Sequence, residues 1–420
     1  MFKVIRTLLT LGPLFAQTTS LVAASPTGLL KRDTNTCPSP YPNPYPYSEG
    51  RSLVLRQNGN DLSFNGVQWI WTKERNPSNN QAPVGTRAFR KEFIPPQGKT
   101  PFILKVAFAI DNVGTLFVNG ETIATEGDWF TAGTYCVPLQ PYTNVIAFSV
   151  TNGATTPNPA GLLVTAEVTY TDGSTSKIVS DGTWRASGAS IPNGWEQLSF
   201  DDSSWSMAVP EGAYPKDPWG TIPIAGASAV SLAPAKWIWT NELTTSGGAV
   251  PVGARAFRRT TTLPIGHTSA SAEVLIAADN QYSLYVNGRF IGSGSSFHNA
   301  QRFTIDNIQA DNGKIVLAVY GNNLNGPGPN PAGILASMQI TSKDPSSCVD
   351  CSSVTYVITD GQWKANRGTP RGFEQPDFDD SAWASAVTEG TVGSSPWGPV
   401  SASSATSTRG APISGAPAGN

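Results

Sequence analysis

Two acidic-amide pairs stand at matching places in this 420-residue sequence. Asp111-Asn112 and Asp279-Asn280 each follow an apolar run, and each precedes a second run that ends in Asn-Gly. A carboxylate, an amide oxygen and nearby carbonyl groups are hard oxygen ligands that calcium accepts, and such an ion can also take two vicinal sugar hydroxyls. The alternative is an Asx-turn at a strand exit. The pairs therefore predict a calcium and sugar site in each half of the chain.

A second oxygen-rich motif also occurs twice. Asn158-Pro159-Ala160-Gly161 recurs as Asn330-Pro331-Ala332-Gly333. Proline removes a competing N–H group, so these segments either supply carbonyl oxygens to a metal ion or form simple turns. We include Asn158 and Asn330 in the predicted metal set on the first interpretation.

Other residues with reactive side chains point less clearly to chemistry. The doublets Asp201-Asp202 and Asp379-Asp380 suggest the paired carboxylates of a glycosidase, but neighbouring residues point in different directions and cannot flank one bond. We predict that they bracket turns by accepting hydrogen bonds from nearby amides. The sequence has two histidines, His267 and His298, and neither has a counterpart in the other copy. This argues against a His-dependent catalytic triad and against a metal centre with several His ligands. A mechanism based on Ser or on acids stays open.

The four cysteines, Cys37, Cys136, Cys348 and Cys351, allow three pairings in an oxidising compartment. Cys348 and Cys351 stand in Cys-Val-Asp-Cys, so a local bridge between them would leave Cys37 to pin the N-terminal segment to Cys136. A redox or zinc role would need a second Cys or His cluster. We therefore predict structural disulfides.

The elements that position these residues come from an internal repeat. Trp69-Ile70-Trp71-Thr72 recurs as Trp237-Ile238-Trp239-Thr240. The further matches are Arg87-Ala88-Phe89-Arg90 with Arg255-Ala256-Phe257-Arg258, Asp181-Gly182-Thr183-Trp184 with Asp360-Gly361-Gln362-Trp363, Phe200-Asp201-Asp202-Ser203 with Phe378-Asp379-Asp380-Ser381, and Pro218-Trp219-Gly220 with Pro396-Trp397-Gly398. The repeated tryptophans are expected to pack in two similar cores.

Each copy contains short, half-alternating runs rich in Val, Ile, Phe and Tyr, with Asn119-Gly120 and Asn287-Gly288 as hairpin turn signals. This pattern predicts an all-β protein of two tandem antiparallel β-sandwiches of jelly-roll type. We place the first domain at 61–222 and the second at 230–400. The stretch 401–420 is poor in apolar residues and is expected to be a disordered tail.

The N-terminus has the features of a secreted protein. Lys3 and Arg6 precede a short apolar run, and small residues near Ala24 suit signal peptidase, so residues 1–24 are a predicted signal peptide. Residues 25–60 form a predicted propeptide and a lead-in rich in Pro and Tyr, and Lys31-Arg32 is either a processing site or an ordinary basic pair. A net charge of -2 argues against nucleic acid, and no later run is long enough to span a membrane.

The ordered set of repeated motifs, from Trp69 to Gly220 and again from Trp237 to Gly398, resembles the galactose-binding-like jelly-roll domain attached to α-L-rhamnosidases. It is similar in particular to their calcium-dependent rhamnose-binding accessory module. The resemblance implies that Asp111-Asn112 and Asp279-Asn280 bridge calcium and a sugar. Trp129 and Phe297, which align loosely, are the predicted aromatic platforms, and loop packing is their alternative role.

No segment like the catalytic barrel of those enzymes follows the second sandwich, so we expect a non-catalytic protein. The function predicted is that of a secreted, extracellular, lectin-like protein, bivalent through its two copies, which binds rhamnose or galactose in a cell-wall or pectic glycan with the help of calcium. Two alternatives remain at this level. One is a secreted glycosidase-related enzyme that acts on plant or microbial cell-wall polysaccharide, and the other is a structural protein of the cell wall.

Overall fold

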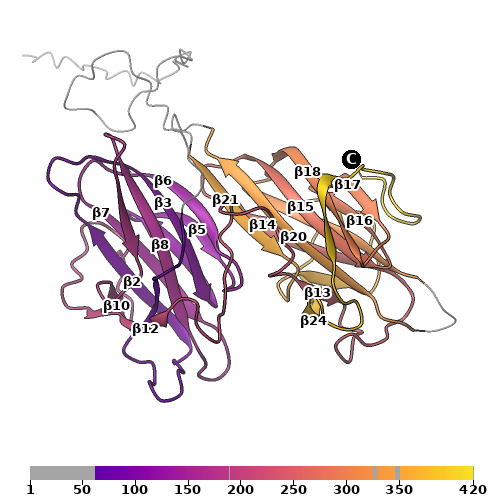
Figure 1. The fold of residues 1–420 in the computed structure, drawn as a ribbon, viewed down its shortest axis with the longest axis horizontal. Coiled ribbons are helices and arrows are strands. Elements are labelled where there is room, and N and C mark those ends of the chain that lie inside the picture. The colour runs from indigo at the N-terminus through magenta and orange to yellow at the C-terminus, as the bar shows by residue number, and fades with distance from the viewer. Residues whose placement is uncertain (1–61, 189, 325–328, 346–350, 420) are drawn as a thin grey trace, which may run out of the picture. The chain divides into compact units, whose positions relative to one another are not determined.

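The computed structural model describes residues 62–188, 190–324, 329–345 and 351–419, and in these ranges the chain forms β-strands and no helix (Figure 1). The predicted all-β fold is confirmed. None of these residues forms a helix with the length and hydropathy of a membrane span. The predicted signal peptide, the lead-in at 25–60, Cys37 and Cys348 lie outside the described residues.

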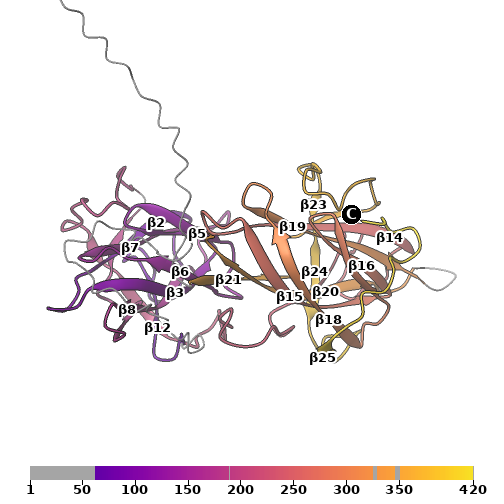
Figure 2. The same ribbon diagram turned by 90° about the horizontal axis from the view of Figure 1, so that it is seen from above.

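The first copy consists of two antiparallel layers. One layer has the order β12-β1-β8-β3-β6, with β9 beside β8, and the other has the order β11-β10-β2-β7-β4-β5. The strands of the first layer are β1 (Gln68–Trp71), β3 (Pro101–Asp111), β6 (Gly133–Pro138), β8 (Gly161–Tyr170), β9 (Thr175–Val179) and β12 (Val209–Ala213). Those of the second are β2 (Gly85–Phe93), β4 (Val113–Val118), β5 (Glu121–Glu126), β7 (Asn144–Asn152), β10 (Arg185–Ser187) and β11 (Ser206–Met207). Figure 2 shows β2 and β7 in one layer and β3 and β8 in the other.

The second copy repeats this plan. Its first layer contains β13 (Lys236–Trp239), β15 (Ser269–Asp279), β18 (Asn299–Gln309), β20 (Gly333–Lys343), β21 (Ser352–Ile358), β24 (Val387–Thr391) and β25 (Ser401–Thr406). Its second layer contains β14 (Gly253–Thr262), β16 (Gln281–Val286), β17 (Arg289–Gly294), β19 (Lys314–Asn323), β22 (Lys364–Asn366) and β23 (Ala384–Ser385). The first layers of the two copies join where Val354 of β21 pairs with Thr134 of β6, which gives a sheet of 13 strands.

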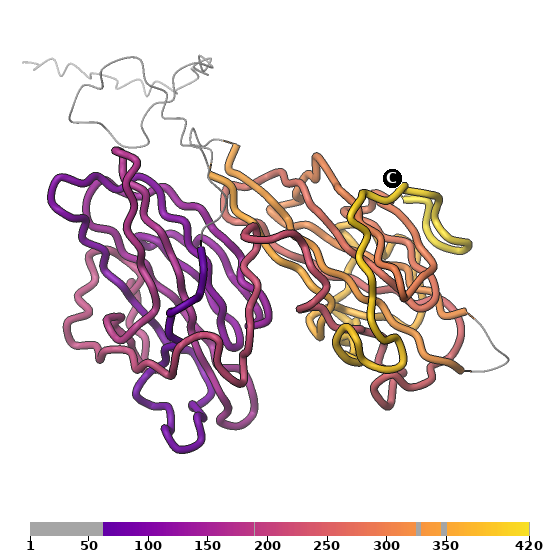
Figure 3. The backbone as a smooth tube through the Cα atoms, viewed as in Figure 1, coloured from indigo at the N-terminus to yellow at the C-terminus, as the bar shows by residue number. Residues whose placement is uncertain are grey.

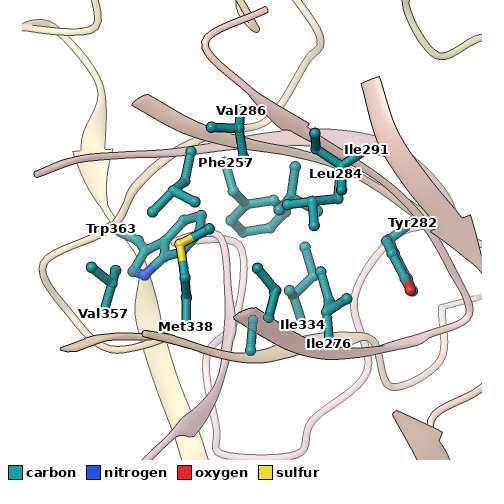
Figure 4. Close-up of a cluster of buried hydrophobic side chains, with 14 of the residues drawn as sticks. Phe257, Ile276, Tyr282, Leu284, Val286, Ile291, Ile334, Met338, Val357 and Trp363 are labelled. Carbon is teal, nitrogen blue, oxygen red and sulfur yellow. The ribbon is translucent and has the colours of Figure 1, made fainter. Parts of the chain in front are cut away.

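The core of each copy lies between its two layers. In the second copy its members include the side chains labelled in Figure 4: Phe257, Ile276, Tyr282, Leu284, Val286, Ile291, Ile334, Met338, Val357 and Trp363. Trp71 and Trp239 are fully buried and lie against Phe89 and Phe257, at centroid distances of 5.5 and 5.2 Å. The predicted packing role of the repeated tryptophans is therefore correct at these positions, and burial of such large rings is a main source of stability.

The repeated polar motifs also have structural roles. Asp201 accepts a hydrogen bond from the Ser203 amide, as predicted for a turn. Asp202 instead pairs with the buried Arg90 over 2.9 Å, and Asp380 pairs with Arg258 over 2.8 Å. The doublets thus fasten a loop to the second layer of each copy.

The disulfide differs from the predicted pairing. Cys351 bonds to Cys136, with their Cα atoms 5.4 Å apart, so neither a local Cys348–Cys351 bridge nor a Cys37–Cys136 bridge forms. The pairing of β6 with β21 brings these two residues together, and this contact between edge strands has no local signal in the sequence. The bridge therefore links the two copies.

The predicted disorder after residue 401 is also wrong. Ser401–Thr406 forms β25, which pairs with β18 in parallel. The residues after β25, in yellow, lie along the second copy (Figure 3). Farther along, the Ile413 amide donates to Oγ of Ser283 over 3.0 Å. The composition predicted disorder because this stretch has few apolar side chains. Strand pairing, however, uses backbone groups, and the open edge of β18 supplies them.

Candidate functional site

In each candidate site, two neighbouring strands hold the aspartate beside the Asn-Pro-Ala-Gly motif. Asp111 is the last residue of β3 and pairs with Gly161, the first residue of β8 and the last of the Asn-Pro-Ala-Gly motif. Asp279 and Gly333 pair in the same way between β15 and β20. The register therefore brings together the two motifs that the sequence singled out, in both copies. The peptide bonds Asp111–Asn112 and Asp279–Asn280 are both cis.

Two stacked tryptophans lie against this pair. Trp219 donates a hydrogen bond of 2.9 Å from Nε1 to Oδ2 of Asp111, and its ring stacks on Trp69 at a centroid distance of 4.1 Å. A Cβ atom added at Gly161 would lie 2.6 Å from Cε3 of Trp69. Glycine is thus the residue that allows β8 to approach the indole, which explains why the motif ends in glycine.

The second copy reproduces this arrangement. Trp397 donates to Oδ2 of Asp279 over 2.9 Å and stacks on Trp237 at 4.5 Å. The Pro-Trp-Gly motif that ends each repeat is therefore part of the candidate site.

A buried glutamate completes the acidic part of each site, and our sequence analysis missed it. Between β1 and β12 the register shifts, because Trp69 pairs with Gly212 while Ile70 pairs with Pro210. Glu211 is therefore the extra residue of a β-bulge, a device that re-aims a side chain. Both carboxylate oxygens of Glu211 are buried without a hydrogen-bond partner.

Glu389 occupies the equivalent bulge between β13 and β24, and its carboxylate oxygens are likewise buried without a hydrogen-bond partner. The signal that could have found both residues is simple. A Glu-Gly pair precedes Pro-Trp-Gly in each repeat, as Glu211-Gly212 and as Glu389-Gly390.

Burial perturbs the ionisation of these carboxyl groups. It raises the pKa of Asp111 to about 6, although the Trp219 hydrogen bond opposes the rise. Burial also raises the pKa of Glu211 to about 8; Arg75 and Lys216 oppose this rise, and the charge of Asp111 adds to it. In the second copy burial raises the pKa of Glu389 to about 8, although the Gly247 amide opposes the rise, and burial also raises the pKa of Asp279. Two neighbouring carboxylates without enough neutralising partners are typical of a site for a cation.

The two copies differ in the positive charge near the glutamate. Nε of Arg75 lies 3.4 Å from Oε1 of Glu211, and both side chains are largely buried. In the second copy Leu243 stands at the position that matches Arg75. The acidic pair of the first copy is therefore partly neutralised by protein charge.

The amide side chains of the predicted site hold the neighbouring loops. Oδ1 of Asn112 accepts a hydrogen bond of 2.7 Å from the Gly153 amide, and Oδ1 of Asn280 accepts one of 2.6 Å from the Leu324 amide. These bonds reach backbone amides 41 and 44 residues farther along the chain, so they are not the local Asx-turn of the alternative interpretation. An amide oxygen has a second lone pair, so the contact leaves room for a further ligand.

Asn158 and Asn330 lie on the loops that end in glycine. The main chain of Asn158 pairs with Ala82, and that of Asn330 pairs with Val250. A pair of buried asparagines that the sequence analysis did not select fixes these loops. Nδ2 of Asn152 donates to the carbonyl oxygens of Ala82, Pro83 and Asn158, and Asn323 makes the equivalent bonds.

The predicted aromatic platforms lie on a loop that follows β5 or β17. Trp129 contacts Phe130 at a centroid distance of 4.0 Å, and Phe297 contacts His298 at 4.1 Å. Asn112 and Trp129 line one cavity of about 220 Å³. In the second copy burial raises the pKa of Asp279, and the Trp397 hydrogen bond and the nearby His298 oppose the rise, which places this loop beside the acidic pair.

Across the part of the chain that the structure describes, no three His, Cys, Asp or Glu side chains gather in a metal-binding group. Each candidate site offers two acidic side chains, so any further ligands would be amide or carbonyl oxygens or water. Oxygen ligands of this mixed kind suit calcium and do not suit zinc.

Comparison with known proteins gives the following similarities. No family model matches the chain. An α-L-rhamnosidase of Streptomyces avermitilis is 30% identical over 229 residues, which is 52% of this chain. The predicted resemblance to α-L-rhamnosidases is confirmed. The chain spans only 20% of the length of this curated relative.

Solved structures are also similar to this chain. A lectin from Pleurotus ostreatus, determined in complex with GalNAc, is 36% identical, with 80% of this chain and 94% of the lectin covered and a TM-score of 0.38. The α-L-rhamnosidase of Streptomyces avermitilis complexed with L-rhamnose is 22% identical, with 82% of this chain and 34% of the enzyme covered and a TM-score of 0.35.

Proposed function

We propose that this chain is a secreted, non-catalytic carbohydrate-binding protein with one calcium-dependent site in each copy. The observation that carries the proposal is the duplicated pair of buried carboxyl groups, Asp111 with Glu211 and Asp279 with Glu389. In each pair the glutamate oxygens lack hydrogen-bond partners. A fold does not keep such a costly arrangement twice without a use for it. The sequence similarity to an α-L-rhamnosidase supports a sugar as the ligand.

The residues present fit a calcium ion. Asp111 and Glu211 would supply negatively charged oxygens, and Asn112, which follows Asp111 in the chain, would supply an amide oxygen. Calcium accepts such a set in flexible geometry and with six to eight ligands, so backbone carbonyls, water and sugar hydroxyls would fill the remainder. When bound, the ion supplies a positive centre to which two vicinal hydroxyl groups of a sugar can bind.

The surrounding residues would orient the ligand. Trp219 holds one oxygen of Asp111, which leaves Oδ1 for the cation. Gly153 holds Asn112, so its side chain is ordered before any ligand arrives. Trp129 lines the same cavity as Asn112 and offers an apolar ring to a sugar face. Because these side chains are already held in place, less conformational entropy is lost when a ligand binds.

The ligand class proposed is a neutral sugar with vicinal hydroxyls, such as L-rhamnose or N-acetylgalactosamine, at the end of a glycan. A single shallow site binds a sugar weakly, and two linked sites raise the avidity for a polymer. A cell-wall or pectic glycan, which presents many such ends, is therefore the natural target.

A glycan array tests this function. The purified chain should bind arrays that display terminal rhamnose or N-acetylgalactosamine in calcium, and the signal should disappear in chelator. The double variant Glu211→Gln with Glu389→Gln should lose the same signal. A chelator-resistant signal that the double variant retains would refute the calcium-dependent site, and release of sugar from the array would show an enzyme.

A further inference from the structure

The cavity beside Asn112 is built by both copies. Its walls from the first copy are Asn112 and the loop from Gly127 to Phe130. Its walls from the second copy are Lys236, Asp360, Gly361 and Gln362. The cavity has a volume of about 220 Å³ and runs from Asn112 and Trp129 to the second-copy wall, so a glycan held at the first site can extend a further residue toward that wall.

The second-copy wall is held firmly in place. Nε2 of Gln362 donates to the Gly127 carbonyl over 2.9 Å and also lies 3.3 Å from Oδ2 of Asp128. Arg259, also of the second copy, donates a hydrogen bond of 2.6 Å to Oε1 of Gln362. These bonds connect the loop of one copy to the strand end of the other, so the wall is present before any ligand binds.

The exposed chemistry of this wall suits a neutral sugar. Nζ of Lys236 lies 3.6 Å from the centroid of the Phe130 ring, so a donor and an aromatic surface stand together. Asp128 is half-buried and adds an acceptor at the wall, while the carboxyl group of Asp360 is buried behind it. Mixed donors and acceptors beside an aromatic surface are typical of sugar sites, whereas an anionic ligand would meet two carboxylates.

The described cavity of the second copy that lies nearest in sequence to its candidate site is built differently. Ser296 stands where the first copy has Asp128, and the cavity beside Gln281 is lined by residues of the second copy alone, Ile413 of the C-terminal segment among them. In the first copy, by contrast, the loop from Gly127 to Phe130 contacts Gln362 and Lys236 of the second copy.

From these contacts we infer that the first copy carries a second sugar subsite, completed by Lys236 and Gln362 of the second copy. The first site therefore binds a disaccharide or a longer neutral glycan, while the second site binds a terminal residue. This inference rests on the proposed function.

The test uses the full chain with one calcium site silenced at a time. Calorimetry in calcium compares L-rhamnose with rhamnosyl-α-1,6-glucose, and N-acetylgalactosamine with N-acetylgalactosaminyl-α-1,3-galactose. In Glu389→Gln, where only the first site works, the disaccharide that carries the bound sugar should bind about tenfold more tightly than the monosaccharide. In Glu211→Gln, the two affinities should agree within about twofold.

A further variant separates the subsite from the calcium site. Lys236→Met, made in Glu389→Gln, should reduce the ratio of disaccharide to monosaccharide affinity to about one. The matched control is Gln68→Met, at the equivalent strand position of the first copy, which should leave the ratio at about ten. Equal affinities in Glu389→Gln, or an unchanged ratio in Lys236→Met, would overturn the subsite alone. Absence of binding for both monosaccharides would overturn the proposed function and the subsite with it.

Discussion

Nε1 of Trp219 donates a hydrogen bond of 2.9 Å to Oδ2 of Asp111, so the last motif of the repeat touches its first acidic residue. The same relationship joins Trp397 to Asp279. Because the partners lie more than a hundred residues apart, each candidate site forms only when a whole copy has folded. The site and the fold are therefore coupled in both halves of the chain.

Calcium stoichiometry is the first consequence. Calorimetric titration of the chain should show two calcium ions, and Glu211→Gln or Glu389→Gln should each remove one of them. The amide keeps the shape of the side chain but removes the charge that the ion requires. Asp201→Asn, at an exposed turn, is the control and should still bind two. Two sites retained in both glutamine variants would show that the bulge glutamates hold no metal.

Acidity should weaken calcium binding. The pKa values of Glu211 and Glu389 are about 8, so near pH 6 calcium must displace a proton from each site. The apparent affinity should fall by up to about tenfold per pH unit for each proton released between pH 8 and pH 6. Titrations at several pH values measure this slope. A flat profile would contradict the assignment.

The calcium-free protein should show the opposite trend in stability. A carboxyl group whose pKa is raised by folding contributes stability that is fully present below its ordinary value and is lost as the pH rises through the raised value. With Glu126, Glu211 and Glu389 all raised from 4.5 to about 8, the free energy of unfolding in chelator should decrease from pH 5 to pH 8. Urea unfolding measures this, and Glu126→Gln should reduce the slope. Stability that increases over this range would refute the raised values.

The copies should differ in calcium affinity. Arg75 lies beside Glu211, whereas Leu243 takes its place in the second copy, so the second site should bind calcium more tightly. Arg75→Leu should raise the affinity of the first site about tenfold, since a nearby positive charge that competes with the cation is removed. Titration of this variant in the Glu389→Gln background isolates the effect. A weaker first site after the substitution would show that Arg75 helps to organise the site.

Glycine at the end of the Asn-Pro-Ala-Gly motif should be required for stability. A Cβ atom at Gly161 would lie 2.6 Å from the Trp69 ring, in a place where neither β8 nor the stacked indoles can move freely. Gly161→Ala should lower the free energy of unfolding by about 1–3 kcal/mol in urea denaturation. The control is Gly182→Ala, whose nearest neighbour would be 3.5 Å away, with an expected change within about 0.5 kcal/mol. Equal stability of the two variants would contradict the packing argument.

Much of the fold was predictable because its signals are local and occur twice. Alternating apolar runs predicted the strands, and Asn119-Gly120 and Asn287-Gly288 indeed have the positive φ angles that a tight hairpin requires. The closeness of Asp111 to the Asn-Pro-Ala-Gly motif was predicted because both motifs occur in each copy, whereas the strand pairing that produces it was not.

The errors concern contacts that no local pattern encodes. Glu211 becomes part of the site only because a β-bulge turns it inward, and a bulge depends on the register of two strands that are distant in sequence. The Cys136–Cys351 bond depends on the meeting of two edge strands, and the order of β25 depends on the open edge of β18. Composition describes side chains and does not report a backbone partner that lies elsewhere in the fold.

The central claim is that calcium held by these buried acids binds a sugar, and one calorimetric comparison tests it most directly. L-rhamnose and N-acetylgalactosamine are titrated into the chain in about 1 mM calcium and again in excess chelator. We predict saturable binding of at least one sugar at two sites in calcium, and no binding in chelator. Binding of equal strength in both conditions, or no heat with either sugar at tens of millimolar in calcium, would contradict the claim.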